Sequence, residues 1–116
     1  MINRRRILIY ISGKFSNPKP QEKAINIRNA TLMAAKVWNA GFTAITPHIN
    51  APQKEDGCTC RYEEFLEGDL ELLLHCEGIL MLPGWEESPG AIVEHNFANE
   101  HSLDIYYSLE ELVADH

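Results

Sequence analysis

Apolar residues form four short runs, and the longer stretches between them have helical spacing. The runs predict strands over residues 7–12, 42–46, 79–82 and 104–107. The first and third runs are continuously apolar, as in strands buried on both faces. Helical spacing covers residues 21–39 and 62–76, a third helix starts at Pro89 after an N-cap at Ser88, and a short helix follows Ser108. This alternation predicts one α/β fold: a small doubly wound parallel sheet, Rossmann-like or flavodoxin-like, with strand order 2-1-3-4 and helices on both faces.

The helix over residues 21–39 has two apolar faces. The main face carries Ala24, Ile27, Ala30, Ala34, Val37 and Trp38, and a weaker stripe carries Ile25, Leu32 and Met33. A helix that is apolar on two sides often packs against another subunit as well as against its own sheet. The pattern therefore predicts a homo-oligomer, either a homodimer or a homotetramer.

Two carboxylates interrupt the apolar faces of the other helices. Glu94 falls in the middle of a face made of Ala91, Val93, Phe97 and Ala98. Asp69 falls at the centre of a face made of Tyr62, Phe65, Leu66, Leu72, Leu73 and Cys76. A carboxylate that faces the sheet is costly unless something uses it. Paired carboxylates perform glycosyl transfer, one attacking or stabilising the sugar carbon while the other positions hydroxyls or moves protons. The alternative is that each one is salt-bridged or bonded to water at the edge of the core.

The ligand crevice of a doubly wound sheet lies at the carboxyl ends of the strands, where the winding direction reverses. Here that place is between the first and third strands. Ser88, Gly90 and the free amides at the helix start can bind an anion, and Lys14 adds charge there. The alternative is that Ser88 only caps its helix and that Lys14 is solvated. The candidate ligand-binding residues are Ser12, Gly13, Lys14, Phe15, His48, Trp85, Ser88 and Gly90.

The amino-acid composition limits which binding partners and which cellular location are expected. The chain has 116 residues, 45% of them hydrophobic, which predicts a single domain over residues 1–116. A formal charge of −7 argues against binding a nucleic-acid polymer. The short basic start, residues 1–6, is followed by no long apolar segment, so neither a signal peptide nor a membrane span is expected. Three cysteines favour a reducing cytoplasm, and Cys58-Thr59-Cys60 lacks the second pair of a structural zinc site, so no metal is expected.

Three short motifs, taken in this order and spacing, resemble the nucleoside 2-deoxyribosyltransferase-like superfamily. They are Tyr10-Ile11-Ser12-Gly13, the Gly-Asp-Leu-Glu-Leu-Leu segment that contains Asp69, and Ser88-Pro89-Gly90 followed by Glu94. The chain resembles most the small bacterial and phage members, and its layout is similar to that of the 2′-deoxynucleoside 5′-monophosphate N-glycosidases.

The resemblance implies a role for each matching residue. It implies that Glu94 attacks the anomeric carbon, that Asp69 orients the sugar and the scissile bond, and that Tyr10 lies near the nucleophile. Gly13 and its neighbours match the loop that borders the base or phosphate. Ser88 stands where the nucleoside transferases carry an aspartate and the monophosphate hydrolases a serine, which implies tolerance of a 5′-phosphate. Lys14 departs from the pattern, because the hydrolases have an arginine near that place.

The sequence therefore predicts an enzyme that cleaves or transfers the N-glycosidic bond of a 2′-deoxynucleoside or its 5′-monophosphate, without metal or other cofactor. One alternative is a nucleotide-binding sensor or regulatory protein that has the same pocket but no turnover. A second alternative is an interaction module that binds no nucleotide and exposes an apolar patch.

Overall fold

Four parallel strands form the centre of the computed structural model, which describes residues 6–52 and 54–116. The strands are β1 (Leu8–Ser12), β2 (Thr43–Ile45), β3 (Gly78–Met81) and β4 (Asp104–Tyr106). They pair in the order β2-β1-β3-β4, and all three pairings are parallel. The predicted α/β fold and its strand order are confirmed, and each strand end differs from its predicted position by at most one residue. Most of the basic start, residues 1–5, lies outside the described residues.

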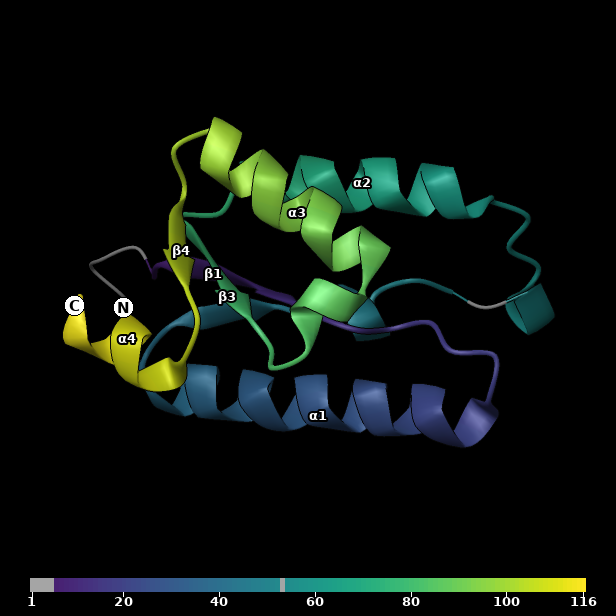
Figure 1. Cartoon of the computed structure of the whole chain (residues 1–116), viewed down its shortest axis with the longest axis horizontal. Coiled ribbons are helices and arrows are strands. Elements are labelled where there is room, and N and C mark those ends of the chain that lie inside the picture. Colours follow the sequence, from purple (N-terminus) through teal and green to yellow (C-terminus); the bar gives the residue numbers. More distant parts are fainter. Residues whose placement is uncertain (1–5, 53) are drawn as a thin grey trace, which may run out of the picture.

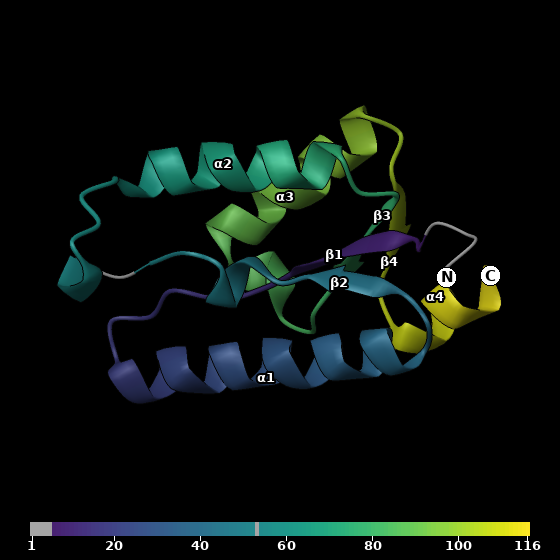
Figure 2. The same ribbon diagram turned by 180° about the vertical axis from the view of Figure 1, so that it is seen from behind.

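Helices cover both faces of this sheet (Figures 1 and 2). α1 (Pro20–Asn39) and the short α4 (Leu109–Ala114) lie on one face, while α2 (Tyr62–Leu74) and α3 (Pro89–Glu100) lie side by side on the other. The described residues also form three 3-10 turns: η1 (Pro47–Ile49), η2 (Lys54–Asp56) and η3 (Trp85–Glu87). None of the helices in the described ranges is both long enough and apolar enough to span a lipid bilayer.

The residues predicted to begin and end the helices have these roles in the structure. The hydroxyl of Ser88 accepts a hydrogen bond from the amide of Ala91 at 3.3 Å, and Pro89 occupies the first helical position. The hydroxyl of Ser108 caps α4 in the same way. α1 ends just before Gly41, whose φ of 100° lies in the left-handed region that favours glycine.

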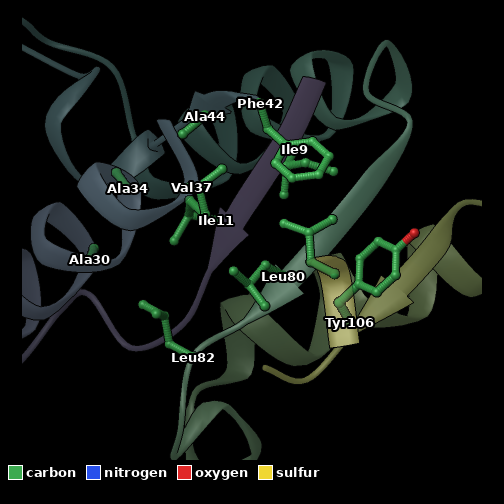
Figure 3. Packing of buried hydrophobic residues seen from close by; sticks show 11 residues of the cluster. Ile9, Ile11, Ala30, Ala34, Val37, Phe42, Ala44, Leu80, Leu82 and Tyr106 are labelled. Atoms are coloured by element: carbon green, nitrogen blue, oxygen red, sulfur yellow. The ribbon is translucent and has the colours of Figure 1, made fainter. Parts of the chain in front are cut away.

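Two apolar clusters fill the layers on either side of the sheet. The cluster against α1 and α4 contains Ile9, Ile11, Val37, Leu80 and Leu112 (Figure 3). The cluster against α2 and α3 contains Tyr10, Leu73, Ile79, Ala91 and Ala98. Side chains of a strand alternate between its two faces, so Tyr10 and Ser12 point away from α1. This alternation aims both hydroxyl groups toward α3.

Some residues expected on the inner helix faces are exposed. In α1 only Ala30, Ala34 and Val37 are buried, whereas Ala24 is exposed and Trp38 is 48% exposed. Tyr62 and Leu72 of α2 are also exposed, and Val93 of α3 is 40% exposed. A 20-residue helix is about 30 Å long, whereas strands of three to five residues span roughly 10–17 Å. The sheet is therefore too short to cover the whole apolar face of α1.

Candidate active site

Glu94 lies at the centre of the site, in the interior of the protein. It sits one turn into α3 and is only 6% exposed. Its Oε2 accepts a hydrogen bond from the Tyr10 hydroxyl at 2.5 Å, and its Oε1 accepts one from the Ser12 hydroxyl at 2.6 Å. The two hydroxyls come from the same face of β1, two residues apart, so one strand holds both oxygens of the carboxyl group. Both bonds are short, as expected when the acceptor carries charge.

Burial and hydrogen bonding act in opposite directions on the pKa of Glu94. Burial disfavours the charged form and raises this pKa from 4.5 to about 7, while the hydrogen bonds from Ser12 and Tyr10 lower it and the nearby charge of Asp69 raises it. The pKa of Tyr10 is raised far above its usual value by burial and by the carboxylate of Glu94. Tyr10 therefore keeps its proton and remains a hydrogen-bond donor to Glu94.

Asp69 lies close enough to Glu94 for their charges to interact. Asp69 is half-buried on α2, and burial raises its pKa from 3.8 to about 6. The phenol of Tyr62 lies near both carboxylates, since Glu94 and Asp69 each add to the effect of burial in raising its pKa. The two helices thus bring two carboxyl groups together, and both groups titrate near neutral pH. Such a pair can provide one ionised group and one proton donor.

Two cavities share Tyr62 in their linings, Asp69 lines one of them, and Glu94 lines neither. The first, called here the Asp69 cavity, has a volume of about 270 Å³, and its lining includes Phe15, Tyr62, Phe65, Asp69, Cys58 and Cys60. The second, called the Ser88 cavity, has a volume of about 240 Å³, and its lining includes Lys14, Asn26, Tyr62, Glu87, Ser88 and Gly90. Tyr62 belongs to both linings and forms the boundary between them.

Two glycines allow close approaches around the site. A Cβ added to Gly13 would lie 2.7 Å from Cβ of Leu82, so only glycine fits between β1 and the turn that follows β3. A Cβ added to Gly90 would lie 2.8 Å from the hydroxyl oxygen of Tyr62. Gly90 therefore lets the Tyr62 phenol rest against the first turn of α3.

Lys14 lies in the Ser88 cavity, but its charge is already paired. Its Nζ lies 2.5 Å from Oε1 of Glu87, and this lysine lowers the pKa of Glu87. The Glu87 side chain is largely exposed and that of Lys14 is partly exposed, so the ion pair is weak and open to competition from another anion. Within this cavity an anion would meet the Ser88 hydroxyl and the lysine together with one opposing carboxylate.

His48 lies behind the loop that borders the site rather than in either cavity. Its Nε2 is 2.8 Å from the carbonyl oxygen of Lys14, so Nε2 carries the proton and donates it, because a carbonyl only accepts. Its ring meets the edge of Phe15 with centroids 5.6 Å apart. Burial lowers the pKa of His48. The histidine is thus a neutral support for the segment that carries Lys14 and Phe15.

Trp85 also lies outside the linings of the Asp69 and Ser88 cavities. Its ring stacks on His95 with centroids 4.4 Å apart, and His95 in turn lies 2.8 Å from the hydroxyl of Tyr107. The structure therefore places Trp85 in an aromatic stack beside α3.

Sequence reasoning missed the position of Tyr62, which it assigned to the core. A signal was present, because Tyr62 precedes Asp69 by seven residues and so shares its helix face. The paired contact of Ser12 with Glu94 was also missed, although Ser12 shares a strand face with Tyr10. Over residues 6–52 and 54–116, no group of three or more His, Cys, Asp or Glu side chains is arranged to hold a metal ion.

The model of a family described as a domain of unknown function, DUF4406, matches residues 7–107, a segment that contains β1 to β4 and the helices α1 to α3. A search of curated proteins finds no match.

Proposed function

This chain belongs to the DUF4406 family, a domain of unknown function, and from its site we propose that it cleaves or transfers the N-glycosidic bond of a 2′-deoxynucleoside or its 5′-monophosphate. The observation that carries the proposal is the carboxyl group of Glu94, buried and held by Tyr10 and Ser12 beside Asp69. The motif resemblance to the nucleoside 2-deoxyribosyltransferase-like superfamily supports the same assignment.

The first step forms a bond between Glu94 and the sugar. An ionised oxygen of Glu94 attacks C1′, and the bond from C1′ to the base nitrogen breaks with its electron pair remaining on the base. Asp69, whose pKa is raised to about 6, donates a proton to the leaving base in those molecules in which it is protonated while Glu94 is ionised. The hydrogen bonds from Tyr10 and Ser12 fix the orientation of the attacking carboxylate.

The second step releases the sugar from Glu94. A water molecule gives hydrolysis, whereas the nitrogen of a second base gives transfer; either nucleophile attacks C1′ and frees the carboxylate. Asp69, deprotonated in the first step, accepts the proton that the nucleophile loses. Two successive displacements at C1′ retain its configuration. No metal or other cofactor takes part in these two steps.

The two cavities suggest how the ligand lies. The base fits the Asp69 cavity, where Phe15 and Phe65 offer aromatic and apolar walls. The sugar then lies near Tyr62, between the two carboxyl groups, and its 5′ end enters the Ser88 cavity. A 5′-phosphate there meets the Ser88 hydroxyl, the first amides of α3 and Lys14. The cytoplasm, where nucleotides are abundant and thiols stay reduced, is the proposed location.

The assembly that we propose is a homo-oligomer formed through α1. Ile25 of its weaker apolar stripe is exposed in the single chain, as are Trp38 and the nearby Ile49. An apolar stripe of this kind is a surface that a second copy can cover.

A non-catalytic nucleotide sensor is the second candidate, and one observation favours it. With a pKa of about 7, about half of the Glu94 side chains are protonated at neutral pH, and a protonated carboxyl is a poor nucleophile. A sensor would bind nucleotides and gain thermal stability without releasing base.

The test is incubation of the protein with a panel of 2′-deoxynucleosides and their 5′-monophosphates at about pH 6, 7 and 8, a range that covers the pKa values of Asp69 and Glu94 because the first step needs Asp69 protonated and Glu94 ionised. We expect free base to appear, to disappear with Glu94→Gln, and to persist with Glu100→Gln, a control at the exposed end of the same helix. Equal release by the parent and Glu94→Gln would refute the role of Glu94. Ligand-induced stabilisation with no base released from any compound would refute turnover and support the sensor.

A further inference from the structure

A third cavity continues the site beyond the Ser88 cavity. It has a volume of about 270 Å³, shares Lys14 and Asn26 with the Ser88 cavity, and extends along α1 to Lys36. Asn26, Asn29, Met33 and Lys36 are spaced three, four and three residues apart, so they form one row on the helix. This row spans about 15 Å at the rise of an α-helix. We call this space the Lys36 cavity.

The three cavities form a connected path across the carboxyl edge of the sheet. Tyr62 joins the Asp69 cavity to the Ser88 cavity, and Lys14 with Asn26 joins the Ser88 cavity to the Lys36 cavity. The path therefore starts at the layer of α2 and α3 and ends at the layer of α1. Figure 1 shows the connection after β3 turning down toward α1 before the chain returns to α3. Leu82 and Pro83 of this connection form a wall of the Lys36 cavity.

The Ser88 cavity and the Lys36 cavity differ in the charged residues that line them. The lining of the Ser88 cavity contains one lysine and the glutamate that pairs with it, so these charges offset each other. The lining of the Lys36 cavity contains Lys14, which pairs with Glu87, Lys36, two asparagines, the apolar residues Leu32, Met33, Leu82 and Pro83, and no acidic residue. Lys36 forms no ion pair with any residue in the described part of the chain. In a protein with a formal charge of −7, Lys36 therefore places a positive charge that is unpaired within the described residues at the end of the ligand path.

We propose that the Lys36 cavity binds the distal phosphoryl groups of a nucleoside 5′-diphosphate or 5′-triphosphate, so that the preferred ligand extends beyond a 5′-monophosphate. This inference rests on the proposed function for the orientation of the ligand. The first phosphoryl group lies in the Ser88 cavity, and the next groups pass Lys14 along the row of Asn26 and Asn29 toward Lys36. The added phosphoryl charge also competes with Glu87 for Lys14, because a polyanion attracts the lysine more strongly than one exposed carboxylate does.

The first experiment measures anion binding alone, so it does not depend on turnover. Inorganic phosphate and inorganic tripolyphosphate are titrated into the full chain by calorimetry at one fixed ionic strength. We expect tripolyphosphate to bind at least tenfold more tightly than phosphate. Lys36→Met should remove most of that difference and Lys36→Arg should keep it. Lys19→Met is the control, since Lys19 is an exposed lysine just before α1 that lines none of the three cavities. Equal binding of the two anions, or equal effects of Lys36→Met and Lys19→Met, would overturn the proposal.

The second experiment separates this inference from the proposed function. Base release is compared for a deoxynucleoside 5′-monophosphate and the matching 5′-triphosphate, with the parent and Lys36→Met. We expect Lys36→Met to lower kcat/KM for the triphosphate by about tenfold and to leave that for the monophosphate unchanged. Release from the monophosphate alone, unaffected by Lys36→Met, would refute the inference and leave the proposed function standing. Tight, Lys36-dependent tripolyphosphate binding without any base release would support the anion site and refute the turnover.

Discussion

Replacing Glu94 by glutamine should make the protein more stable at alkaline pH, because it removes a buried charge and keeps the shape of the side chain. The pKa of Glu94 is about 7 in the folded protein and about 4.5 when exposed. The folded state therefore binds this proton more tightly than the unfolded state does. The resulting stability is fully present below about pH 4.5 and is lost as the pH rises through 7. The full loss is about 3 kcal/mol, of which about 2.5 kcal/mol falls between pH 5 and pH 8.

Urea denaturation of the parent and Glu94→Gln at about pH 5 and about pH 8 measures this quantity. The free energy of unfolding of the variant, relative to the parent, should rise by about 2–3 kcal/mol between the two pH values. Asp69 titrates in both proteins, so its contribution largely cancels in the comparison. Glu100→Gln should show no such dependence on pH. If the difference between Glu94→Gln and the parent is the same at both pH values, Glu94 is not a desolvated carboxyl group and the description of the site is wrong.

Two further substitutions test the surroundings of this carboxyl group. Tyr10→Phe removes a hydrogen-bond donor that favours the ionised form of Glu94, so the pKa of Glu94 should rise. The midpoint of the increase in activity with pH should therefore move up by about one pH unit. An unchanged midpoint would show that Tyr10 does not alter the pKa of Glu94. Gly13→Ala places a Cβ 2.7 Å from that of Leu82, so the free energy of unfolding in urea should fall by roughly 1–3 kcal/mol. The control is Gly68→Ala in α2, where a Cβ meets no atom within 4 Å, and it should stabilise by up to about 1 kcal/mol. Equal effects of the two alanines would contradict the close contact.

The periodicity of apolar residues along the sequence was enough to predict the arrangement of strands and helices. Alternating strands and helices predicted the parallel sheet in the order β2-β1-β3-β4. Ser88 followed by Pro89 predicted the start of α3, and the helical position of Glu94 predicted its burial. The element boundaries and the direction of Glu94 depend on neighbours within a few residues along the chain, so local patterns are sufficient to predict them. The strand order follows from the rules that govern how alternating strands and helices connect.

Only the tertiary structure decided which distant side chains meet. Tyr10 and Ser12 contact Glu94 from more than 80 positions away, and Tyr62 separates two cavities at a place where periodicity had assigned it to the core. The ion pair of Lys14 with Glu87 and the support from His48 likewise join separate loops. Such contacts depend on the lengths of the strands and on how closely the layers pack, as the exposure of Trp38 beyond the short sheet shows. The helical and strand periods of a sequence indicate the direction of a side chain but not how far the opposing element extends. The sequence therefore predicted that the two carboxylates point inward, whereas packing between the layers determined which residues surround them.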